Sequence, residues 1–212
     1  MKSMLGLFSL LVSFALYFSP QISFAYLGIL ESGELIGAGH NRVGVAPQVV
    51  SSEGGGFNLD LFVDRGISES TSGRLTIGFG KIDVFLGAAV KWIPFPDVDK
   101  QPAMGIKTSA WYGRVDSSNA LTVQIAPLVS KKIPFEHGEL IGYSAIPFNI
   151  TSIKDRSYTG TQFAIGAEFK SPQIDHVLWT GEIDFNLKDS QTAFNISASF
   201  PFDGSKGLFQ RN

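Results

Sequence analysis

Two stretches indicate the fold most clearly: His176-Val-Leu-Trp-Thr-Gly-Glu-Ile-Asp-Phe-Asn-Leu-Lys188 and Ala193-Phe-Asn-Ile-Ser-Ala-Ser-Phe-Pro-Phe202. Both alternate apolar and polar residues, and side chains on a β-strand point alternately to opposite faces. Each stretch therefore predicts a strand with one apolar and one polar face, and the short polar interval 189–191 predicts a hairpin. In the first strand we expect an apolar face of Val177, Trp179, Ile183, Phe185 and Leu187, and a polar face of Thr180, Glu182, Asp184 and Asn186.

The same two-residue period continues toward the N-terminus. It predicts further strands at Glu34–Val50, Phe57–Asp64, Arg74–Phe79, Ile82–Phe95, Ala103–Val115, Asn119–Ser130, Gly138–Ile150 and Thr161–Lys170. Gly80-Lys81 is expected to close a hairpin, the polar stretches 66–73 and 151–160 are expected to be loops, and the lead-in 26–33 has no assignable pattern. Proline gives no backbone donor to a ladder, so bulges or strand ends are expected at Pro47, Pro127, Pro147 and Pro201. The total is about ten short strands and no convincing helix after the first residues.

The N-terminus has the pattern of a secretory signal peptide. Lys2 precedes an apolar run from Leu5 to Phe18, and Ser23-Phe24-Ala25 is a small-residue cleavage site. The run is about fourteen residues long, shorter than the roughly twenty that a membrane-spanning helix needs. We therefore expect residues 1–25 to be removed, which leaves 26–212 as a single β-barrel domain.

Composition narrows the class of protein. Cysteine is absent, which excludes a disulfide scaffold. The formal net charge is −2, and so small a charge argues against nucleic acid as a partner. No second long apolar run follows the signal, so a membrane location would require a closed barrel, because lipid cannot satisfy the backbone groups at an open sheet edge. These features leave the oligomeric state open.

Strands of roughly ten residues with this period are what a transmembrane barrel requires. The chain resembles the small outer-membrane β-barrel proteins of Gram-negative bacteria, through the signal ending at Ser23-Phe24-Ala25 and the alternating final strand Phe194 to Phe202. The resemblance implies an antiparallel transmembrane barrel of about eight to ten strands in the outer membrane. It also implies two partners, the outer-membrane lipid and the barrel assembly machinery that reads the final strand. The alternative is a secreted or periplasmic soluble barrel that binds an apolar ligand in its core.

In a membrane barrel the polar face of each strand lines the lumen. The charged residues with that parity, which are the candidate lumen-facing residues, are Arg42, Asp60, Asp64, Asp83, Lys91, Lys107, Glu168, Glu182, Asp184 and Lys188. Opposite charges in a narrow lumen must pair, because an isolated buried charge is costly. Two hypotheses follow: a salt-bridged lumen that only stabilises the barrel, or a thin polar passage for ions or small solutes.

Motifs of catalysis and metal binding are missing from the sequence. The 3 histidines, His40, His137 and His176, stand on separate segments without a paired metal-ligand spacing. Neither a nucleophile elbow nor a phosphate-binding loop is present. We therefore expect no enzymatic activity, no cofactor and no metal, and a structural, adhesive or narrow-channel role.

Overall fold

The computed structural model describes residues 28–51, 55–115, 118–154 and 156–202; the predicted signal peptide and its cleavage site lie outside this part of the chain. Its elements are all strands: β1 (Asn41–Val50), β2 (Gly56–Ser68), β3 (Thr71–Gly80), β4 (Val84–Phe95), β5 (Ala103–Val115), β6 (Ser118–Phe135), β7 (Gly138–Ala145), β8 (Phe148–Ile153), β9 (Arg156–Ser171), β10 (Ile174–Lys188) and β11 (Ala193–Phe202). No helix in these residues is long and apolar enough to cross a membrane.

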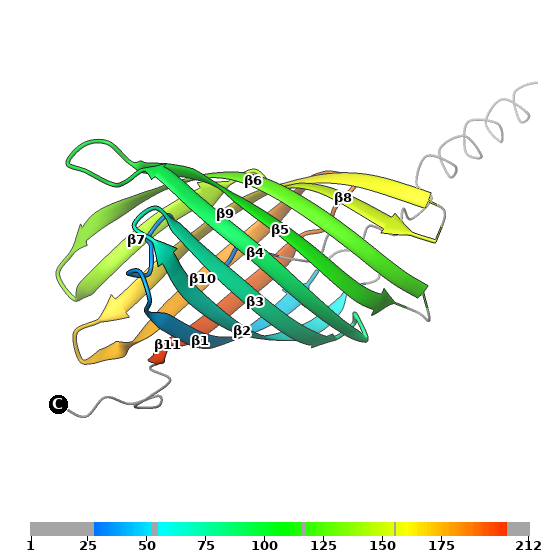
Figure 1. The fold of residues 1–212 in the computed structure, drawn as a ribbon, viewed down its shortest axis with the longest axis horizontal. Coiled ribbons are helices and arrows are strands. Elements are labelled where there is room, and N and C mark those ends of the chain that lie inside the picture. The colour runs from blue at the N-terminus through cyan, green and yellow to red at the C-terminus, as the bar shows by residue number, and fades with distance from the viewer. Residues whose placement is uncertain (1–27, 52–54, 116–117, 155, 203–212) are drawn as a thin grey trace, which may run out of the picture.

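The strands form a closed antiparallel barrel and are strongly tilted (Figure 1). Consecutive strands pair with each other, except that β7 and β8 each pair with β6 and β9 instead, and β1 closes the ring against β11. β1 begins and β11 finishes at the same end of the barrel, which we call the entry end, on the left in Figure 1. The β2–β3, β4–β5, β6–β7 and β9–β10 connections also lie at this end, and the other end is the far end. The prediction of an all-β antiparallel barrel is confirmed.

One position in the barrel is shared by β7 and β8. Both pair with β6 on one side and β9 on the other, and the register continues across the break, with Ala145 opposite Leu128 and Phe148 opposite Ile125. The eleven strands therefore occupy ten positions around the ring. The break contains Pro147 and lies opposite Pro127 of β6, and neither proline has a backbone N–H to donate. The expected strand end at Pro147 is confirmed, whereas Pro127 stays within β6.

Several strand bounds differ from the prediction. The expected loops at 66–73 and 151–160 are too long, because β2 runs to Ser68, β3 starts at Thr71, and β8 and β9 leave only a two-residue connection. The hairpin expected at Gly80-Lys81 turns instead through 81–83, so Asp83 belongs to a connection. β1 begins at Asn41 rather than Glu34, because residues 28–37, which precede it, are not part of the wall. Pro47 lies inside β1, paired with Leu59 of β2.

The two faces of the wall have opposite chemistry. Along β4, for example, Phe85, Ala89, Lys91 and Ile93 are buried, while Leu86, Val90 and Trp92 between them are exposed. Across the barrel, large apolar side chains cover the outside, and the buried interior contains many Asp, Glu, Lys, Asn and Gln side chains. This arrangement is the reverse of a soluble protein, in which apolar groups leave water and polar groups face it.

Exposed aromatic residues gather near the two ends of the barrel. Near the entry end they are Trp92, Phe95, Phe135 and Trp179. Near the far end they are Phe57, Phe79, Tyr112, Phe185 and Phe194. The middle of the outer surface is mostly aliphatic, although Phe148 is exposed there. Two aromatic bands around an apolar belt are typical of barrels that cross a membrane.

The hairpin of β10 and β11 departs from the predicted faces at two positions. Trp179, Phe185 and Leu187 are exposed as expected, and Thr180, Glu182 and Asp184 are buried. Val177 is buried instead, because the ladder shifts register between Ile174 and Leu178 and the irregularity turns this side chain inward. Asn186 is exposed because it lies where β10 leaves the barrel for its turn.

Candidate functional site

The lumen contains residues of the chain that precede β1. Residues 28–34, here called the lumen segment, lie inside the barrel before the chain turns at the entry end into β1. Ile29, Leu30, Glu31, Ser32 and Gly33 are all buried. Ile29 packs in a cluster with residues of β4, β5, β6, β7 and β9. A ring of ten strands encloses more space than wall side chains alone fill, and the lumen segment takes that space.

Three cations reach the lumen segment from neighbouring strands, and we call them the basic wall: Arg74 on β3, Lys91 on β4 and Lys107 on β5. Lys107 Nζ lies 2.6 Å from Glu31 Oε1 and Lys91 Nζ 2.9 Å from Glu31 Oε2. The three cations also donate hydrogen bonds to backbone carbonyls of the segment: Lys107 to Ile29 (2.7 Å), Arg74 to Leu30 (3.4 Å), and Lys91 to Ser32 and Glu34 (2.7 Å each).

Two carboxylates hold the other side of the segment, and we call them the acidic wall: Glu168 on β9 and Glu182 on β10. Glu182 accepts hydrogen bonds from the backbone N–H groups of Ile29 and Leu30, each at 2.8 Å. Glu168 accepts from the backbone N–H of Ser32 at 2.7 Å and from its hydroxyl at 2.6 Å. Donors of the segment thus face the acidic wall and acceptors face the basic wall, so the lumen binds an extended backbone through both sets of polar groups.

Further side-chain contacts complete this site. Gly33 N–H donates to Ser130 Oγ at 2.9 Å, and the Tyr143 hydroxyl donates to Glu182 Oε2 at 2.8 Å. Arg74 also forms an ion pair within the wall: its Nε lies 2.6 Å from Asp64 Oδ1 and its Nη2 lies 2.9 Å from Asp64 Oδ2. The Arg74 guanidinium also stacks over the Phe62 ring, 4.1 Å from its centroid.

The far half of the lumen is filled by amides and apolar groups. Gln48 pairs with Asn58, and Gln124, Asn149 and Gln162 form a chain that ends on the carbonyl of Gln191. A buried apolar cluster lies beyond them: Val50, Ile82, Phe85, Trp111 and Ala193. Both aromatic rings of this cluster pack where glycines of the neighbouring strands leave room, Trp111 over Gly87 and Phe85 over Gly78.

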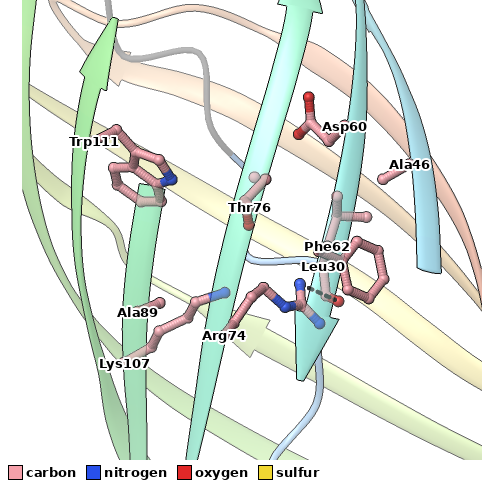
Figure 2. Close-up of a pocket in the computed structure, with 10 residues that line it drawn as sticks. Leu30, Ala46, Asp60, Phe62, Arg74, Thr76, Ala89, Lys107 and Trp111 are labelled. Atoms are coloured by element: carbon pink, nitrogen blue, oxygen red, sulfur yellow. Dashed lines mark hydrogen bonds between the residues drawn. The ribbon is translucent and has the colours of Figure 1, made fainter. Parts of the chain in front are cut away.

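A small cavity of about 20 Å³ remains between the two halves, and Figure 2 shows Arg74 and Lys107 reaching inward beside it, with the Arg74–Leu30 hydrogen bond dashed. Asp60 and Trp111 line it as well. This volume is about the space of one water molecule. This cavity is too small for the apolar ligand that the soluble-barrel alternative requires.

The predicted lumen-facing residues fall into three groups. Asp60, Asp64, Lys91, Lys107, Glu168, Glu182 and Asp184 are buried. Arg42 is half-buried near the start of β1. Asp83 and Lys188 are exposed and depart from the prediction, because Asp83 lies in the β3–β4 connection and Lys188 is the last residue of β10.

Sequence reasoning missed two residues that matter at this site. Arg74 has the parity opposite to Leu75, Ile77 and Phe79, so the alternation of β3 contained the signal that could have placed it in the lumen. Glu31 had no such signal, since the sequence of residues 26–33 shows no strand pattern, and Glu31 itself lies in the lumen rather than in the wall.

Groups suited to metal binding are absent from the described ranges, in which no cluster of three or more His, Cys, Asp or Glu side chains could hold an ion. His40, His137 and His176 are all exposed.

The comparisons with known proteins give similarity at the level of whole barrels. No protein-family model matches the chain, and no curated protein sequence matches it. Among solved structures, it is similar to the β domain of the Bordetella autotransporter BrkA, with 10% identity over 78% of this chain and 100% of that one, at a TM-score of 0.49. The translocator domain of the autotransporter NalP from Neisseria meningitidis matches with 11% identity over 80% of this chain and 91% of that one, at a TM-score of 0.48.

A third similar structure is a bacterial polysaccharide outer membrane secretin, with 10% identity, coverage of 77% of this chain and 66% of that one, and a TM-score of 0.47. At this level of similarity the roles of these proteins do not extend to this chain.

Proposed function

We propose that this protein is a non-enzymatic outer-membrane β-barrel with a narrow passage for small charged solutes, which the lumen segment closes at rest. The observation that carries the membrane location is the reversed polarity of the wall. Apolar patches on soluble monomers rarely exceed a few hundred Å², whereas here exposed apolar side chains surround the barrel. Lipid removes that surface from water, and the closed ladder leaves no backbone edge unsatisfied in it.

The passage is supported by how the lumen charges are partnered. A lumen that only stabilised the wall would pair wall cations with wall anions. Here Lys91 and Lys107 form ion pairs with Glu31 of the lumen segment, and Glu168 and Glu182 bind its N–H groups. These wall charges thus bind the lumen segment, which is not itself part of the wall. Its removal would leave a channel lined by both signs of charge, as in a pore that selects solutes by charge.

The closed state is expected to be stable, because the lumen segment is bound tightly. Hydrogen bonds to charged groups contribute about 1.5–3 kcal/mol each, and the basic and acidic walls make several of them with the lumen segment. Spontaneous withdrawal is therefore rare, and conductance of the unmodified protein is expected to be small or absent. The same stability favours a second candidate function, a permanently closed barrel with a structural or adhesive role.

A planar bilayer recording separates the two candidates. Glu168→Gln/Glu182→Gln replaces the acceptors of the segment's N–H groups by neutral amides, whose hydrogen bonds are about half as strong. We expect this variant to conduct in bursts. Glu139→Gln, which changes an exposed carboxylate on β7, is the matched control and is expected to remain silent.

A disulfide lock tests whether the lumen segment is the gate. A Cβ added at Gly33 would lie 2.6 Å from Ser130 Oγ, and the chain has no cysteine of its own. In the Glu168→Gln/Glu182→Gln background, Gly33→Cys/Ser130→Cys is expected to lose the bursts on oxidation and to regain them on reduction. A folded Glu168→Gln/Glu182→Gln variant that stays silent would refute the passage and leave the closed barrel. A large, steady conductance of the unmodified protein would refute the closed state.

The partners that we propose are the outer-membrane lipid and the barrel assembly machinery. The basis for the second is β11, which ends at Phe202 and pairs on both sides, with β1 and β10. As the strand that closes the ring, it is the last one needed for assembly.

A further inference from the structure

We propose that Lys91 and Lys107 form a binding site for a small monocarboxylate, which the carboxylate of Glu31 occupies in the closed barrel. The inference rests on the proposed function in one respect, that the lumen segment can yield its place. It adds a ligand class to that function. A small carboxylic acid anion that takes the site would compete with Glu31 and so weaken the hold of the barrel on the lumen segment.

The geometry of the site is that of a carboxylate clamp. Its two ammonium groups come from adjacent strands, β4 and β5, on which Lys91 and Lys107 lie directly opposite each other. Each contacts a different oxygen of Glu31, at 2.9 Å and 2.6 Å. Both lysine side chains are almost fully buried, so their charges cannot be compensated by water. Charge-assisted contacts of this length are among the strong ones in proteins.

The other charged groups around this site already have partners, so an anion is needed only to balance Lys91 and Lys107. Arg74 is already engaged in two contacts with Asp64 and does not need a further anion. Glu168 and Glu182 are matched by N–H and O–H donors of the lumen segment and by Tyr143. Glu31 is therefore the anion that the two lysines share. Without it, the two buried cations would lose their ion pairs and keep hydrogen bonds to backbone carbonyls of the lumen segment, which is a costly state.

The size of the ligand follows from the occupant. Glu31→Ala removes one methylene and the carboxylate, which together correspond to acetate. A dianion such as phosphate would bring a second negative charge close to the acidic wall. We therefore expect selectivity for small monocarboxylates over phosphate and over chloride.

Chemical rescue of the full-length protein tests the site without any recording of current. Glu31→Ala, refolded in detergent micelles, is expected to lower the midpoint of thermal unfolding by on the order of 10 °C, since it leaves buried cations unpaired. Acetate should restore most of that loss, and chloride or phosphate at equal ionic strength should not. If the variant does not fold in chloride, its refolded yield in acetate against chloride is the readout.

Two further variants make the result specific. Glu34→Ala removes a neighbouring carboxylate that is exposed and pairs with Lys132 at 3.2 Å, and acetate is expected to leave its midpoint unchanged. Glu31→Ala/Lys107→Met removes half of the clamp, and acetate is expected to lose its effect. The proposal is wrong if acetate is no better than chloride for Glu31→Ala, or if it helps all three variants equally. Rescue without current in the bilayer experiment would refute the passage alone, and current without rescue would refute the carboxylate site alone.

Discussion

Two valines provide the sharpest test of the apolar outer face. Val63 lies in the middle of β2, between Val43 and Leu75 of the adjacent strands, and is 46% exposed. Val98 lies in the β4–β5 connection at the entry end and is 56% exposed. In water, arginine would cost little at either position, because surface substitutions usually change stability by less than about 0.5 kcal/mol. In a bilayer, arginine at the middle of the wall costs about 2–4 kcal/mol and near the interface about 0–1 kcal/mol.

The assay is denaturant unfolding of the protein in phospholipid vesicles. We expect Val63→Arg to lower the free energy of unfolding by about 2–4 kcal/mol and Val98→Arg by about 1 kcal/mol or less. Both changes replace valine by arginine at exposed positions, so the difference between them isolates the depth in the membrane. Equal losses for the two variants would refute a lipid-facing belt around β2.

Two other predictions concern single contacts. Gly87→Ala is expected to cost about 1–3 kcal/mol, because the added Cβ would lie 1.9 Å from the buried ring of Trp111; Gly181→Ala, with open space around it, should be neutral in the same unfolding assay, and equal effects would refute the packing argument. In the β4–β5 connection, the hydrogen bond from Lys131 holds the pKa of Asp97 below its ordinary value of 3.8, so this contact stabilises the connection above that pH and is lost as the pH falls through the lower, folded value. Amide hydrogen exchange across residues 96–102 should therefore accelerate at acid pH relative to Asp97→Asn, and the same pH dependence in both proteins would contradict this.

The wall of the barrel could be predicted because period-two alternation is a local property. Each face of Phe57–Asp64 or Ile82–Phe95 is set by its own residues, whichever neighbours the strand later finds. Alternation fails where the backbone departs from regular pleating. Val177 turned inward at a register shift, and such an irregularity leaves no mark in the order of apolar and polar residues.

The contents of the lumen could be predicted only in part. Buried charges such as Lys107 and Glu182 share the parity of their strands, so their position followed from the pattern. Their common partner did not, since the lumen segment shows no periodicity and its place depends on long-range contacts with β4, β5, β9 and β10. The division of one barrel position between β7 and β8 could not be predicted either, because it follows from the register of both strands with β6.

Quenching of tryptophan fluorescence by brominated lipids tests most directly which face of the wall meets the membrane. Of the 3 tryptophans, Trp179 is 45% exposed on the outside, in the outer band near the entry end, and Trp111 is 7% exposed among the buried residues. In vesicles, a variant that keeps only Trp179 (Trp92→Phe/Trp111→Phe) should be strongly quenched, and one that keeps only Trp111 (Trp92→Phe/Trp179→Phe) should be nearly unaffected. Strong quenching of Trp111, or none of Trp179, would contradict a membrane barrel with an apolar outside and a filled polar lumen.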